Sequence, residues 1–80
     1  MRGMQEVDLH GMDRDDALAE VERELNHSFL QDTEDRRLRF ITGWGSVIRP
    51  TVQEYLVNHP LVKEISVDGP SIRIMLEDLN

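Results

Sequence analysis

The sequence has no cysteine and no long run of apolar residues. The first absence excludes a disulfide framework and any thiolate-bound metal. The second argues against a transmembrane helix, which needs roughly 18–20 predominantly apolar residues in a row. The beginning of the sequence also lacks the charged and apolar regions of a signal peptide. We therefore expect a soluble, cytoplasmic protein that has no membrane partner.

Basic residues are scarce. The chain has 9 Lys and Arg against 16 Asp and Glu, which gives a formal net charge of −7. Non-specific affinity for nucleic acid comes mainly from neutralising phosphates, so this balance argues against a general nucleic-acid binder. Every basic residue except Lys63 is an arginine, whose planar guanidinium matches a phosphate through two hydrogen bonds. The composition therefore allows a local positive patch and excludes a basic surface overall.

The 80 residues are enough for one domain, 1–80, with a core from about 6 to 78. Hydrophobic periodicity and capping residues predict six elements in this domain. These are a strand at 7–10, a helix from an Asp13 cap to about Leu30, a strand at 38–42, a helix starting near Ser46 and stopped by 58–60, and strands at 62–67 and 72–76.

The predicted strands alternate between apolar and polar residues, whereas sheets covered on both faces are apolar throughout. This pattern predicts a two-layer α/β sandwich of order βαβαββ, with a four-stranded mixed sheet and both helices on one face. The residues expected to face the helices are Val7, Leu9, Leu38, Phe40, Ile65, Val67, Ile72, Ile74 and Leu76. Those expected on the open face are Asp8, His10, Arg39, Arg73 and Met75. Right-handed crossovers favour parallel pairing of the first three strands, then an antiparallel hairpin, in the order 1-2-3-4.

The turn Gly43-Trp44-Gly45 follows Thr42 at the end of the second strand and precedes the second helix. Glycines allow a tight turn around the aromatic ring, and a helix start presents unpaired N–H groups and partial positive charge to an anion. The turn therefore favours a phosphate site that includes Ser46. The alternative is an ordinary strand-to-helix turn with a partly buried tryptophan.

Asp8 and His10 project from the same face of the first strand, near its carboxyl end. Histidine transfers protons near neutral pH, and a neighbouring carboxylate orients it. The alternative is two solvated polar residues on an edge strand. A metal site would need a third ligand from Asp13, Asp15 or Asp16, and helix capping explains these three aspartates more simply.

Three arginines and the tryptophan are candidates for contacts with nucleic acid. Arg49, beside the glycine turn, could hold a phosphate or pair with an acid, and Trp44 could stack on a base. Arg39 and Arg73, on the open face, could contact a phosphate backbone or lie in water.

Two segments resemble the Smr (small MutS-related) domain family. Val7-Asp8-Leu9-His10-Gly11 is similar to its opening motif, and Ile41-Thr42-Gly43-Trp44-Gly45 is similar to its second motif. Arg49 and the segment 59–62 also fit, so the likeness extends over nearly all of residues 6–78. Two departures are the Ser46-Val47 pair where many members have a further glycine, and the short connection 68–70 before the last strand.

The resemblance implies a βαβαββ sandwich that binds nucleic acid and, in several members, cleaves DNA or RNA. It assigns cleavage mainly to Asp8 and His10, and it implicates the glycine loop of Gly43, Trp44 and Gly45 in binding and activity. Gly11, next to His10, is a further candidate contact. We therefore expect an endonuclease, independent of metal or assisted by Mg²⁺, that acts on RNA or on branched or nicked DNA. The alternatives are a non-catalytic module that binds nucleic acid or a ribosomal or repair protein, and a dimer formed through the sheet.

Overall fold

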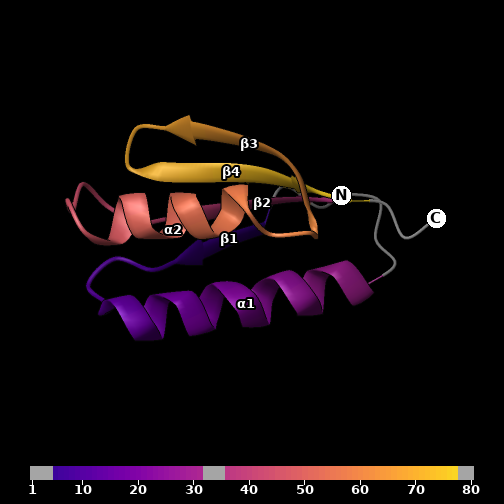
Figure 1. Ribbon diagram of the computed structural model, residues 1–80, viewed down its shortest axis with the longest axis horizontal. Helices are drawn as coiled ribbons and strands as arrows, with labels where there is room; N and C mark the ends of the chain where they lie inside the picture. Colours follow the sequence, from indigo (N-terminus) through magenta and orange to yellow (C-terminus); the bar gives the residue numbers. More distant parts are fainter. Residues whose placement is uncertain (1–4, 32–35, 78–80) are drawn as a thin grey trace.

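The computed structural model describes residues 5–31 and 36–77. Its elements are β1 (Gln5–Asp8), α1 (Arg14–Leu30), β2 (Arg37–Ile41), α2 (Ile48–Val57), β3 (Val62–Asp68) and β4 (Ser71–Leu76) (Figure 1). The predicted α/β class and βαβαββ order are confirmed. Within the described residues, no helix is long and apolar enough to cross a membrane.

The first helix forms as its sequence predicts. The Asp13 side chain accepts a hydrogen bond of 2.8 Å from the Asp16 amide, which caps the helix N-terminus. Ala17, Val21 and Leu25 form a stripe with no solvent exposure. The second helix begins later than predicted: Ser46 and Val47 form a turn, and the Thr51 amide donates to the Val47 carbonyl at 3.1 Å.

The predicted strand order is wrong, because β4 lies between β2 and β3. The sheet has the order β1-β2-β4-β3. As predicted, β1 is parallel to β2, and β3 and β4 form an antiparallel hairpin. The expected parallel pairing of β2 with β3 is wrong, because β2 pairs with β4 and is antiparallel to it. Apolar content explains this placement: Ile72, Ile74 and Leu76 of β4 are at most 3% exposed, whereas most of β3 lies in water. The more apolar strand takes the central position.

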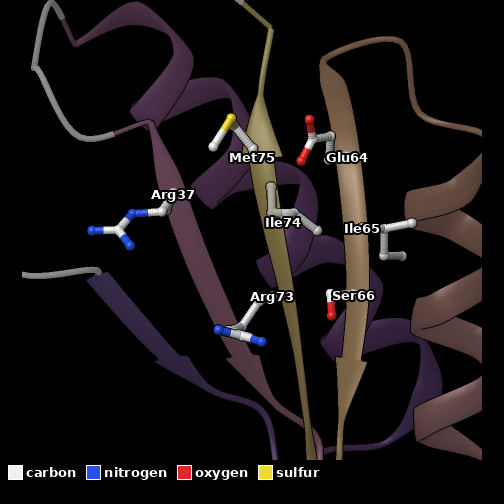
Figure 2. A pocket seen from close by; sticks show the side chains of 7 residues that line it. All are labelled: Arg37, Glu64, Ile65, Ser66, Arg73, Ile74 and Met75. Atoms are coloured by element: carbon white, nitrogen blue, oxygen red, sulfur yellow. The ribbon is translucent and has the colours of Figure 1, made fainter.

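A single hydrophobic core joins one face of the sheet to both helices. Phe40, Leu9, Leu38 and Ile72 from the sheet pack with α1 and α2 residues in one cluster. Val67 was expected in this layer but is 39% exposed, because it lies on the edge strand β3. The opposite face of the sheet carries no helix; Figure 2 views it with α1 behind the strands.

Candidate nucleic-acid site at the strand ends

Three connections meet at one end of the molecule, on the left of Figure 1: β1 to α1, β2 to α2, and β3 to β4. The Leu9 amide donates to the Ile41 carbonyl at 2.8 Å, so the parallel strands β1 and β2 stay in register up to their ends. A Cβ atom built on Gly43 would lie 3.6 Å from the Cβ of His10. The histidine and the glycine turn are therefore neighbours, and Gly43 itself has φ +75°, a conformation that favours glycine.

Asp8 and His10 form a hydrogen-bonded pair at the surface. His10 Nδ1 lies 2.7 Å from Asp8 Oδ1, and the same oxygen accepts the His10 amide at 3.1 Å. The side chains of His10 and Asp8 are 69% and 57% exposed. These hydrogen bonds lower the pKa of Asp8, so the ionised carboxylate accepts and Nδ1–H donates.

This tautomer leaves Nε2 of His10 as the nitrogen that can exchange a proton with a ligand. The hydrogen bond to Asp8, reinforced by its negative charge, raises the pKa of His10. A larger fraction of the imidazole is consequently protonated near neutral pH. The pair is thus suited to proton transfer at an exposed position.

The glycine turn is anchored to the β3–β4 turn through one carbonyl. Pro70 O accepts from the amides of Thr42 and Gly43 at 2.9 and 3.0 Å, and from Thr42 Oγ1 at 3.2 Å. Thr42 is 3% exposed, so its hydroxyl positions the turn from inside. The Gly43 amide already donates to Pro70, so within the predicted phosphate site this N–H group is not free to bind an anion.

Trp44 is exposed, so the partly buried tryptophan of the alternative interpretation is not observed. The side chain is 72% exposed, and Arg49 Cζ lies 5.5 Å from the ring centroid in a cation–π arrangement. The ring also lies against the β3–β4 turn, because a Cβ on Gly69 would be 3.6 Å from it. Gly69 and Pro70 were not predicted to support the glycine turn and Trp44. The short connection 68–70 before the last strand was the feature of the sequence that could have indicated them.

The remaining predicted contacts line the same end or the open sheet face. Gly11, Gly45 and Ser46 are exposed, and the N-cap residue of α2, Val47, makes no side-chain capping hydrogen bond. Arg39 and Arg73 face each other across β2 and β4; Arg39 pairs with Glu6 at 3.2 Å and Arg73 with Asp68 at 3.9 Å. Among residues 5–31 and 36–77, no three His, Asp or Glu side chains are grouped to hold a metal ion.

This arrangement defines a small α/β sandwich whose loops gather an acid–base pair, an exposed aromatic ring and a helix start. The Smr domain model matches residues 7–71, and the chain belongs to this family of nucleic-acid-binding modules. No significant match was found among curated proteins.

Two solved structures are similar to this chain. The crystal structure of the Smr domain of Thermus thermophilus MutS2 has a TM-score of 0.84 and 23% identity, with 92% of this chain and 99% of that chain covered. This likeness establishes the fold. The solution structure of the SMR domain of NEDD4-binding protein 2 has a TM-score of 0.75 and 30% identity, with 98% of this chain and 91% of that chain covered.

Proposed function

We propose that this Smr domain binds nucleic acid at the strand ends and cleaves a phosphodiester bond there. The observation that carries the proposal is the exposed Asp8–His10 pair, held at 2.7 Å beside the glycine turn. Its Nε2 is directed away from the carboxylate and is available to a substrate. The substrate is RNA or branched or nicked DNA.

His10 acts as the proton-transfer residue. Its raised pKa favours the imidazolium form, which donates a proton to the leaving oxygen as the P–O bond breaks. The attacking oxygen comes from water or from a ribose hydroxyl, and the proton that it loses passes to solvent at this exposed site. Asp8 fixes the tautomer and stabilises the charged ring, which returns to the neutral form in the step.

Binding is shared by the groups around the turn. Trp44 offers an exposed face to a base, since stacking on an aromatic ring needs no particular sequence. Arg49 and the uncapped start of α2 supply positive charge to a phosphate. Gly11, Gly45 and Ser46 leave room for the backbone of the ligand. Mg²⁺ commonly binds through one or two carboxylates and substrate phosphates. In a metal-assisted reaction Asp8 and a phosphate of the substrate would hold the ion, which would stabilise the negative charge on the phosphate oxygens.

Cleavage of labelled single-stranded RNA, single-stranded DNA and supercoiled plasmid tests the proposal, with and without EDTA. We expect His10→Ala to lower the rate about 10²–10⁴-fold. His27→Ala, at an exposed position in α1, is the matched control. If His10→Ala cleaves as fast as the wild type, the assigned site is wrong.

The second candidate is a binding module without catalysis, whose ligand is nucleic acid or a ribosomal or repair protein. The net charge of −7 and the commitment of the Gly43 amide to Pro70 favour it, because both weaken a phosphate site. It predicts no cleavage but saturable binding that Trp44→Ala weakens. Affinity that falls steeply with salt identifies nucleic acid, and a flat salt response identifies a protein.

A further inference from the structure

Charge is sorted by strand on the open face of the sheet. The central strands β2 and β4 contribute Arg37, Arg39 and Arg73 to this face. Figure 2 shows Arg37 and Arg73 projecting from these two strands. The register places Arg39 directly opposite Arg73, and Arg37 opposite Met75. We call these three residues the arginine stripe; it runs along the middle of the sheet toward the end that holds Asp8 and His10.

Carboxylates line both edges of the stripe. The edge strand β1 contributes Glu6 and Asp8, and the edge strand β3 contributes Glu64 and Asp68. We call these four residues the acidic rims. Lys63 lies at the register shift between Val62 and Glu64, where β3 has its irregularity. The net acidity of the chain is therefore compatible with a positive strip, because the acids on this face lie to its sides.

The face is hollowed over part of the stripe. A depression of about 230 Å³ has Arg37, Arg73, Ser66 and Met75 in its lining, with Glu64 at the β3 side (Figure 2). Ser66 lies opposite Arg73 and Met75 lies opposite Arg37, so these arginines have uncharged neighbours along the depression. A narrow anionic chain can therefore approach the guanidinium groups.

The existing ion pairs leave the stripe receptive to a phosphate. Arg39 and Arg73 are directly opposite each other, and like charges in this position repel. Each pairs with a carboxylate of its own rim, Glu6 at 3.2 Å and Asp68 at 3.9 Å. Exposed pairs of this kind contribute little to stability, so a phosphate placed between the two guanidinium groups can replace the carboxylates. Arginine can form two parallel hydrogen bonds with a phosphate, as it can with a carboxylate.

The dimensions fit one nucleic-acid strand. Neighbouring β-strands are about 5 Å apart, so the stripe is about one backbone wide, and the rims lie about 5 Å further out on each side. Residues two positions apart on a strand lie on the same face, about 7 Å from each other. Arg39 and Arg73 are therefore one such spacing from the level of Asp8 along the strands, and Arg37 is two spacings from it. A single strand that lies along the stripe can reach His10. A duplex in the same place has a second phosphate backbone, which lies against one of the acidic rims.

We propose that the open sheet face is a track for single-stranded nucleic acid, in which the arginine stripe binds the backbone and the acidic rims reject duplex. The inference rests on the proposed function, because the track leads to the Asp8–His10 pair. It narrows the substrates proposed above to single strands, such as single-stranded RNA or an unpaired arm of branched DNA. It also adds a path and a basis for selectivity that the strand-end loops do not provide.

Fluorescence anisotropy in EDTA tests the track, with a labelled oligouridylate as the single strand and an RNA duplex of the same length as the competitor. The double variant Arg39→Gln/Arg73→Gln should lose at least about tenfold in single-strand affinity, and its log–log salt slope should fall by about 1.4, or 0.7 for each lost contact. The control double variant Arg14→Gln/Arg23→Gln removes the same charge from α1, on the other side of the sheet. Thermal melts by circular dichroism verify that each variant is folded.

The rims are tested separately with Glu64→Gln/Asp68→Asn. This variant should bind the duplex several-fold more tightly while single-strand affinity rises less, so the selectivity ratio falls. Equal single-strand affinities for the stripe variant and its control would overturn the track. An unchanged ratio in the rim variant, or equal binding of oligouridylate and polyglutamate by the wild type, would overturn the assigned selectivity.

The two proposals fail in distinguishable ways. Binding that depends on the stripe, without any cleavage, supports the track and rejects the nuclease. Cleavage that depends on His10 but not on the stripe supports the nuclease and rejects the track. A wild-type chain that binds no nucleic acid rejects both.

Discussion

Two histidine–carboxylate pairs of similar geometry lie at different places in this fold. His10 Nδ1 and Asp8 Oδ1 are 2.7 Å apart at the surface, and His59 Nε2 and Glu22 Oε1 are 2.8 Å apart between α1 and the end of α2. The His10 side chain is 69% exposed, and that of His59 is 9% exposed. Distance alone therefore does not separate a reactive pair from a structural one.

The second nitrogen of each ring separates them. The Leu61 amide donates to His59 Nδ1 at 3.1 Å, so His59 is the neutral tautomer with its proton on Nε2, facing Glu22. The same Glu22 oxygen accepts the Tyr55 hydroxyl, and Asn26 Nδ2 donates to the other oxygen at 2.8 Å. His59 has both nitrogens occupied and ties α2 to α1. His10 has the opposite tautomer and an open nitrogen.

The largest expected difference is in stability. His59→Ala removes a hydrogen bond to an ionised carboxylate and leaves the Leu61 amide without its acceptor, at a cost of about 2–3 kcal/mol. For a domain of this size the melting temperature should fall by about 10–20 °C. His10→Ala should melt as the wild type does, because its side chain lies in water. Melts followed by circular dichroism compare the two; equal losses would remove the distinction between the pairs.

The stability that the structural pair, Glu22 and His59, gives to the fold should decrease in acid because of Glu22. Hydrogen bonds from Tyr55, Asn26 and His59 lower the pKa of Glu22 from 4.5 to about 2. A depressed folded-state pKa stabilises the fold above 4.5, and this contribution is lost as the pH falls toward 2. Because the Glu22 side chain is 44% exposed, solvent screening reduces the contribution to about 1–2 kcal/mol.

Urea unfolding of Glu22→Gln at several pH values measures this contribution. The difference in unfolding free energy from the wild type should be largest near neutral pH and shrink through the acid range. Glu20→Gln, on the same helix, controls for the loss of one negative charge. A difference that does not vary with pH would show that the hydrogen bonds to Glu22 do not favour its ionised form.

The surface pair was predictable from sequence and the structural one was not. The alternation of residues 7–10 predicted that Asp8 and His10 project to one face. The two side chains do form a pair, although β1 ends at Asp8 and His10 lies in the turn that follows it. Glu22 lies 33 positions from Tyr55 and 37 from His59, and only the packing of the two helices brings them together. Local pattern carries no information about such a contact.

The same limit explains the other errors. Alternating strands gave the two-layer class, but not that β4 would insert between β2 and β3, since the crossover rule fixes handedness and not the number of strands skipped. The use of the Gly43 amide by Pro70 also depends on that insertion, because β4 brings its preceding turn beside β2. The adjacency of the His10 and Gly43 loops was predictable because β1 and β2 pair in parallel.

The pH dependence of cleavage tests whether His10 of the surface pair, Asp8 and His10, supplies the proton. Asp8 raises the pKa of His10, so a reaction that needs imidazolium should persist to higher pH in the wild type. Asp8→Asn should move the alkaline limb of kcat/KM to lower pH, toward the ordinary histidine value of 6.5. The His10 ring signals in an NMR titration should shift in the same direction. A limb that stays in place would mean that His10 is not the titrating group.

Any stability that the protonation of His10 gives to the fold is present below pH 6.5 and is lost as the pH rises past the folded-state pKa.

The smallest expected effect is on the pKa of the Tyr55 phenol. Its measurement tests whether Glu22 is bonded to both Tyr55 and His59. Burial, with a smaller contribution from the hydrogen bond to Glu22, raises the pKa of Tyr55 to about 12. Because Tyr55 is the only tyrosine, its ultraviolet titration reports this group alone. In Glu22→Gln the pKa should fall only part of the way toward 10, since burial remains. A value that does not move would mean that the carboxylate serves His59 alone.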